Sequence, residues 1–344
     1  IMTQGYLPDE RPPVWKLLLY ALQQVVVMFP ATVAVAIITG FHISTTIFAS
    51  GLATICFILV TGRKIPLYYG SSFSYVAAIA SLMSSEALAG LGLNDKIAIA
   101  QFGIVMSGFV SIIAGFIVSR FGKDAIEKLL PASVTGPIAM VIGLTLAGTA
   151  LQDAASIAID TAGNISVTES QVALAGNMAW IISLVTLIST ILFSVYLKGF
   201  WGQLPLLLGP LLGCLTAFII NALTGIDLFK VLPDTAKSGF FALPIFTLPK
   251  PSLMAVAAIM PIAIATIPES TAHIYQLDIY VNDLARKKGS GKVYNLADKL
   301  GLNLIGDGIG DIVAGFVGGP AGTNYGENIS AMAITKVFSV WVLI

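Results

Sequence analysis

Three ionisable residues lie inside apolar stretches of the chain. Glu269 and His273 are four residues apart, and Glu327 enters another apolar segment shortly after a Gly-Gly-Pro run at residues 318–320. The four-residue spacing places Glu269 and His273 on one helix face. In a bilayer, a carboxylate at the centre costs about 2.5–3.5 kcal/mol even on the lenient scale, so such residues are functional by default. A Glu–His pair that only holds helices together is the alternative.

Another pair of ionisable residues, Asp307 and Asp311, has the same four-residue spacing in a glycine-rich segment. The surrounding Gly306, Gly308 and Gly310 indicate close helix packing. We expect Asp311 to line a polar cavity. For Asp307, a structural and a functional role stay equally open.

Two carboxylates beside aromatic residues predict a particular ligand. Carboxylates only accept hydrogen bonds, whereas the free N–H groups at a helix start donate them. Phe73 lies one turn into an interrupted segment, where it can stack on a flat ring, and Tyr325 is either site wall or packing. A flat ligand with N–H donors and carbonyls, such as uracil, fits this set. Two nearby glutamates would repel an anion such as sulfate.

The composition places the chain in a membrane. It is 56% hydrophobic and 10% charged, with a mean hydropathy of +0.90, whereas soluble domains average about 25% charged residues. The net charge of zero gives no basic surface for nucleic acid. Cys56 and Cys214 are isolated and predict neither a disulfide nor a metal site. We expect no cofactor beyond a coupling proton.

Ten segments are candidate membrane spans, because a crossing helix needs about 20 mostly apolar residues. Three of them, near 67–83, 133–150 and 325–336, are short or interrupted by Gly, Pro or Ser. The other segments lie near 15–39, 44–61, 97–119, 180–197, 204–223, 252–277 and 300–317.

The positive-inside rule favours ten crossings with a cytoplasmic N-terminus. This arrangement places fourteen of the 18 Lys and Arg residues inside, and four outside: Lys96, Lys230, Lys237 and Lys250. The polar stretch 151–177 is then an external loop. The apolar end of the chain, residues 338–344, suggests that further helices are absent.

Two pairs of segments repeat. Residues 28–32 (MFPAT) resemble 266–270 (TIPES), and residues 69–73 (YGSSF) resemble 325–329 (YGENI). The copies are seven spans apart, so the second enters from the opposite side. Inverted repeats with broken helices are typical of secondary transporters that bind substrate near the midplane. Pro66 and Pro320 favour extended chain, so we expect paired strands at 65–69 and 321–325. A half-helix would then start at each glycine, with Ser71 or Ser72 capping the first.

At these residues the chain resembles the nucleobase–ascorbate transporter family, and within it the bacterial uracil permeases. The family signature is Gln, Glu or Pro, then Asn, any residue, Gly, four residues and Thr. Here it reads ENISAMAITK at residues 327–336. Ser330 replaces the signature glycine, and Gln23-Gln24 replaces the usual Gln-His of the first span.

The resemblance implies an all-α polytopic fold of fourteen helices in two inverted seven-helix repeats, with its C-terminal helices absent here and short strands before the broken third and tenth helices. It implies a core domain from residues 1–130 and 252–344 and a gate domain from residues 131–225. The remaining gate helices are missing.

The resemblance also implies site residues. Glu269 and Glu327 would hydrogen-bond the base, and Phe73 would pack on it. Main-chain groups near Ala31 and Gly326 would meet its polar edge, with Tyr325 nearby. His273, Gln24 and Asp307 would support proton coupling alongside the two glutamates.

The predicted function is proton-coupled uptake of uracil or a related pyrimidine across the bacterial cytoplasmic membrane. The partners are the base and the lipid bilayer, with a homodimer left open. A xanthine or urate permease on the same scaffold is the main alternative, and an anion carrier is a weaker one. A zinc hydrolase would need a second histidine at helical spacing. The only other histidine, His42, is expected at the opposite membrane face, so no enzyme is predicted.

Overall fold

The computed structural model describes residues 5–122, 171–197, 205–226, 228–229 and 242–344, together with scattered positions between 124 and 155. The chain divides into two compact units, residues 1–142 with 244–344 and residues 143–243. Most of the predicted span at 133–150 and of the predicted loop at 151–177 lies outside the described residues.

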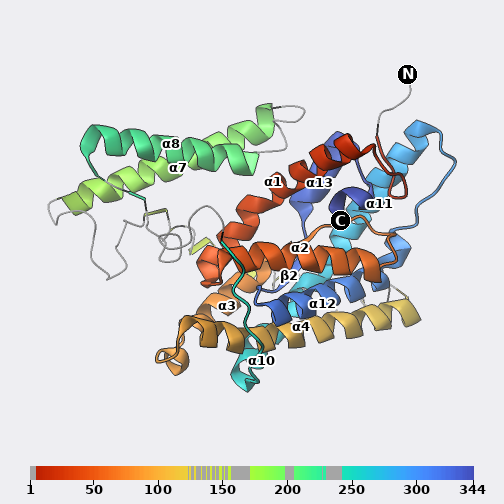
Figure 1. Ribbon diagram of the computed structural model, residues 1–344, viewed down its shortest axis with the longest axis horizontal. Coiled ribbons are helices and arrows are strands. Elements are labelled where there is room, and N and C mark those ends of the chain that lie inside the picture. The colour runs from red at the N-terminus through yellow and green to blue at the C-terminus, as the bar shows by residue number, and fades with distance from the viewer. Residues whose placement is uncertain are drawn as a thin grey trace. The chain divides into compact units, whose positions relative to one another are not determined.

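The first unit is helical apart from two short strands (Figure 1). Its α-helices are α1 (Val14–Thr39), α2 (Ile43–Val60), α3 (Val76–Met83), α4 (Leu93–Phe121), α10 (Leu253–Ile259), α11 (Ala263–Lys288), α12 (Leu300–Val317), α13 (Gly326–Thr335) and α14 (Val340–Leu343).

Six helical stretches among the described residues are long and apolar enough to cross a membrane. Five belong to the first unit: α1, α2, α4, the continuous stretch Leu253–Lys288 and the stretch Ala297–Val317. The prediction of a mostly helical membrane protein with several spans is therefore confirmed. Beyond the predicted span, α11 continues in a polar helical part to Lys288.

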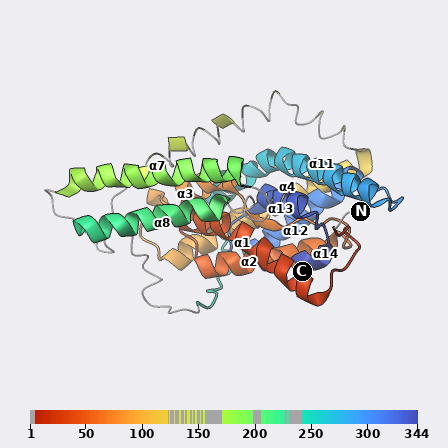
Figure 2. The same cartoon turned by 90° about the horizontal axis from the view of Figure 1, so that it is seen from above.

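Helix α12 packs closely against both α2 and α4 (Figure 1). A Cβ atom on Gly308 would lie 2.4 Å from the carbonyl oxygen of Gly108, and one on Gly306 would lie 2.6 Å from the ring of Phe57. Only glycine permits these approaches, so the predicted close packing around the 306–310 glycines is confirmed. From above, α11 runs along α4 and α13 (Figure 2).

The two strands form one antiparallel pair, β1 (Tyr69–Ser71) with β2 (Gly322–Asn324). Gly70 lies opposite Thr323 in this ladder. The second strand falls inside the predicted range, but the first starts where the predicted strand ends. The Thr54 hydroxyl explains the shift, because it binds both the N–H and the carbonyl of Tyr69, at 3.1 and 2.9 Å, and fixes that residue against α2.

A helix follows each strand. After β1, a short turn of 3₁₀ helix (Phe73–Tyr75) leads into α3, and the Ser72 side chain accepts a hydrogen bond from the N–H of Ser74 at 3.2 Å. The first helix therefore begins three residues after the predicted glycine. After β2, α13 begins at Gly326, and no side chain caps it.

The second unit contains α7 (Val172–Tyr196) and α8 (Pro205–Thr224), which pack together. A Cβ atom on Gly213 would lie 2.0 Å from Oγ1 of Thr186, so this contact requires glycine. Helix α7 starts earlier than the predicted 180, since residues 172–176 are already apolar.

Candidate functional site

A cavity of about 360 Å³ lies in the first unit where the two strands give way to their helices. Such a volume is within the range of small-molecule sites. Its lining comes from three parts of the chain. These are Ser71, Ser72 and Phe73 after β1, Glu269 and His273 from α11, and Thr323, Asn324, Tyr325, Gly326, Glu327 and Ser330 from β2 and α13.

Helix α11 contributes one carboxylate and the imidazole. Glu269 and His273 both line the cavity, as their four-residue spacing predicts. The hydroxyl of Ser74 donates a hydrogen bond to Oε2 of Glu269 at 3.1 Å. This contact links α11 to the helix that follows β1, and it leaves Oε1 of Glu269 available to a ligand.

Helix α13 contributes the second carboxylate and an open helix start. The first backbone N–H groups of a helix have no partner within it, and here no side chain caps them. A Cβ atom on Gly326 would lie 3.1 Å from Nε2 of His273, so glycine allows the two helices to approach. Among the described residues, nothing forms a hydrogen bond with the carboxylate of Glu327, which faces the cavity.

The two aromatic residues play different parts in the structure. Phe73 is 38% exposed and borders the cavity. Tyr325 is buried, and its hydroxyl donates to the Ser71 carbonyl at 2.9 Å and lies 3.1 Å from the Thr32 hydroxyl. Tyr325 therefore forms a fixed wall, whereas Phe73 is free to contact a ligand.

A buried polar network holds the two carboxylate-bearing segments together. Ser270, next to Glu269, donates to the Asp307 carboxylate on α12. The Ser270 hydroxyl also accepts hydrogen bonds from Nδ2 of Asn303 at 2.7 Å and of Asn324 at 3.0 Å. Asn324 ends β2, just before α13. The network thus fixes α11, α12 and β2 relative to one another.

Three other predicted residues lie behind the cavity. Asp307 is buried in the network and is absent from the lining. Gln24 accepts a hydrogen bond from Nδ2 of Asn328 at 2.7 Å, so it supports α13 from α1. Ala31 is buried and does not line the cavity.

The expectation that Asp311 lines a cavity is wrong. Its carboxylate accepts hydrogen bonds from the Tyr69 hydroxyl and, at 2.8 Å, from the N–H of Gly322. Asp311 is also absent from the lining. It binds a residue of each strand and therefore anchors the strand crossing to α12.

Sequence reasoning missed several polar members of the site. Thr323 and Asn324 line the cavity, and Ser74 holds Glu269. A usable signal existed for Ser74, because it lies beside Phe73 in an interrupted span. The role of Asn324 depends on a contact with Ser270 more than 50 residues earlier, which no local pattern predicts.

Comparisons with known proteins agree with this architecture. Residues 15–344 match a family described as "Permease family". The chain belongs to this permease family. It is 34% identical to the uracil permease of Bacillus caldolyticus, covering 97% of this chain and 70% of that protein.

Two further relatives come from Escherichia coli (strain K12). Its uracil permease is 31% identical over 97% of this chain and 70% of its own length. Its putative pyrimidine permease RutG is 30% identical over 98% of this chain and 69% of its own length. Family membership makes the chain a multi-pass membrane transporter and not an enzyme.

Solved structures also resemble this fold. The transmembrane domain of a cyanobacterium bicarbonate transporter, BicA, aligns with a TM-score of 0.56 and 16% identity, covering 100% of this chain and 84% of that one. At this identity the likeness concerns the fold alone. It supports a transporter scaffold and says nothing about the substrate of this permease.

Proposed function

We propose that this permease takes up uracil or a closely related pyrimidine base by proton symport. The observation that carries the proposal is the meeting of Glu269, Glu327 and Phe73 at one cavity beside an open helix start. Acceptor-only carboxylates suit the N–H groups of the base. The N–H groups of α13 suit its carbonyls, and the Phe73 ring offers a face for stacking.

The relatives point to the same class of ligand. Two of them are named as uracil permeases and a third as a putative pyrimidine permease. These names do not favour the xanthine or urate alternative. An anion carrier is disfavoured by the site itself, because two carboxylates border the cavity and would repel an anion.

The position of the carboxyl groups at the cavity supports the proposal of proton coupling. Glu269 and Glu327 are both half-buried at the cavity, and a carboxyl group can bind and release a proton. We assign the coupling proton to one of them, with His273 assisting through Glu269. Protonation outside would permit substrate binding, and proton release inside would free the substrate. Gln24 and Asp307 support these groups from behind.

We further propose that the helices form inverted repeats, with residues 1–130 and 252–344 as a core domain and residues 131–225 as part of a gate domain. The antiparallel pairing of β1 with β2, each followed by a helix, supports the inversion. The N-terminus is assigned to the cytoplasm by the positive-inside rule. Movement of the core past the gate would carry the site across the membrane.

Replacing Glu269 with Gln tests the coupling. In proteoliposomes with an inward proton gradient, we expect Glu269→Gln to abolish gradient-driven accumulation of labelled uracil while measurable binding remains. The isosteric amide keeps an acceptor oxygen but cannot release a proton. Glu86→Gln is the matched control, since Glu86 is exposed in the short 3₁₀ helix Glu86–Leu88 and does not line the cavity. Gradient-driven uptake equal to wild type in Glu269→Gln would refute the coupling role.

A further inference from the structure

Ser330 occupies a distinctive place on α13. It lines the cavity and is exposed, whereas its neighbours Ile329 and Ala331 are 0% and 1% exposed. Ser330 follows Gly326 by four residues and Glu327 by three, so all three lie on one helix face. All three also line the cavity. This face of α13 is therefore the one that meets the ligand.

The Ser330 hydroxyl is not used by the fold. Hydroxyls on helices commonly bind the carbonyl four residues earlier, and Thr335 on the same helix does so, to Ala331 at 2.8 Å. Thr54 and Thr271 bind helix carbonyls in the same way. Within the described part of the chain, no hydrogen bond involves the Ser330 hydroxyl. The residue instead borders the open cavity.

The chemistry of Ser330 complements that of Glu327. An ionised carboxylate only accepts hydrogen bonds, whereas a hydroxyl also donates one. In a pyrimidine dione, each ring N–H has a carbonyl as an immediate neighbour. An acceptor and a donor one helical turn apart on one face therefore match adjacent N–H and C=O groups on the edge of the base.

We propose that Ser330 is a specificity-determining residue whose hydroxyl donates a hydrogen bond to the ring carbonyl next to the N–H that Glu327 accepts. This inference deepens the proposed function and rests on it. It assigns a preference for bases that carry an oxygen acceptor at that ring position. A glycine or alanine at this position would leave the carbonyl without a side-chain donor.

Thio analogues make the contact testable, because a thiocarbonyl sulfur is a much weaker acceptor than oxygen. We would measure equilibrium binding of uracil, 2-thiouracil and 4-thiouracil to purified wild type, Ser330→Ala and Ser330→Thr. A hydrogen bond of ordinary net strength predicts a loss of about three- to tenfold in uracil affinity for Ser330→Ala. That loss should disappear for the one analogue whose sulfur replaces the contacted oxygen. Ser330→Thr keeps the donor and should restore the wild-type order.

Several outcomes are decisive. The proposal is overturned if Ser330→Ala binds uracil as wild type does, or if it loses the same factor for all three ligands. Ser84→Ala is the control, since that exposed hydroxyl binds only carbonyls of its own helix. Should Ser330→Ala be unstable, Ser330→Gly provides the same deletion of the donor. Failure of wild type to bind uracil would instead contradict the proposed function, so the two failures are distinguishable.

Discussion

Tyr325 illustrates how single residues fix the shape of the site. Its ring lies over Gly70 in the first strand, where a Cβ atom would approach the ring to 2.5 Å. Its hydroxyl bonds to the backbone of Ser71, so the ring is held at both ends. Glycine at position 70 therefore serves a close approach of side chain to backbone. The repeated Tyr-Gly pairs were visible in the sequence, but this contact between them was not.

Gly70→Ala tests this contact. The added methyl group would overlap the Tyr325 ring, and such overpacking typically costs about 1–3 kcal/mol. We expect a lower thermal unfolding midpoint in detergent and weaker ligand binding, because the wall of the cavity moves.

Gly51→Ala is the matched control for this experiment. It lies in α2, where a new Cβ atom would meet no atom within 4 Å apart from its chain neighbours and the backbone of its own helix, and alanine is a better helix former than glycine. We expect the control to be as stable as wild type or more so. Equal stability of the two variants would show that the Tyr325 approach does not constrain residue 70.

The structure brings six of the predicted site residues to one cavity. Glu269, His273, Glu327, Gly326, Tyr325 and Phe73 all border the cavity. The prediction for Asp311 was wrong, because a carboxylate can either face a cavity or bind donor groups in the protein interior. Asp311 carries a carboxyl group as Glu269 does, yet it binds Tyr69 and Gly322 in the interior. Sequence spacing shows which helix face a residue lies on, but not what that face meets.

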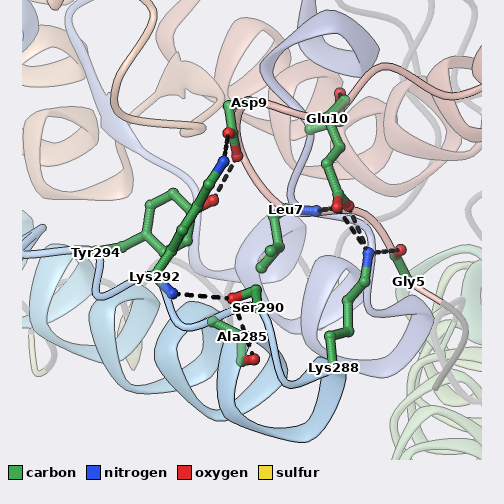
Figure 3. A network of polar contacts seen from close by, with 10 residues as sticks. Gly5, Leu7, Asp9, Glu10, Ala285, Lys288, Ser290, Lys292 and Tyr294 are labelled. Carbon is green, nitrogen blue, oxygen red and sulfur yellow. Dashed lines mark hydrogen bonds and ion pairs between the residues drawn. The ribbon is translucent and has the colours of Figure 1, made fainter. Parts of the chain in front are cut away.

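At the scale of elements, residues 5–10 form a strap that connects the ends of α11 and α13, two helices that line the cavity. Tyr6 pairs with the chain just after α13, through hydrogen bonds to Lys336 and Phe338 at 2.9 and 2.8 Å. At the far end of α11, Lys288 contacts Glu10 at 2.6 Å (Figure 3). The strap thus joins the ends of α11 and α13 away from the cavity.

Asp9 of the strap forms a second ion pair, with Lys292 (Figure 3). Partial burial opposes the charge of Asp9, but hydrogen bonds from Lys292 and Tyr294 outweigh burial and hold the pKa of Asp9 below its ordinary value. The hydrogen bond to Asp9 raises the pKa of Lys292. The pair therefore stabilises the strap from about pH 4, the unfolded value for Asp, to about pH 10.4, the unfolded value for Lys.

We predict that the strap loosens when pH falls through the lowered pKa of Asp9. Hydrogen–deuterium exchange at the amides of Tyr6 and Phe338 would measure this. Wild type should lose protection below about pH 4, whereas Asp9→Asn should start from reduced protection at neutral pH and lose less on acidification. Glu86→Gln again serves as control. Identical profiles for wild type and Asp9→Asn would contradict the role of this ion pair.

The long helices were largely predictable, because a helix that crosses a membrane needs a long run of apolar residues, and such runs are visible in the sequence. The starts of α1, α2 and α8 lie within one residue of the predicted segments. The first strand was misplaced because its position depends on the Thr54 hydroxyl of a neighbouring helix. Local signals such as Pro66 indicate extended chain without fixing its partner.

At the scale of the whole molecule, the fold places two broken segments from distant parts of the sequence beside one another. Paired strands satisfy backbone groups that lipid cannot, and in the proposed inverted-repeat arrangement this would allow helices to start inside the membrane. Composition predicted a membrane protein, and the interrupted segments with the family resemblance predicted a transporter; family membership shows both. The network around Ser270 was not predictable, since it joins three elements through contacts of long sequence separation.

The most direct test of the account is equilibrium binding of uracil to the purified protein and to Glu327→Gln. We predict that wild type binds uracil and that unlabelled uracil, but not xanthine, displaces the labelled base. Hydrogen bonds to charged groups contribute about 1.5–3 kcal/mol, so Glu327→Gln should bind uracil roughly ten- to a hundredfold more weakly. Uracil binding of equal strength in wild type and Glu327→Gln would contradict the assignment of this cavity as the substrate site.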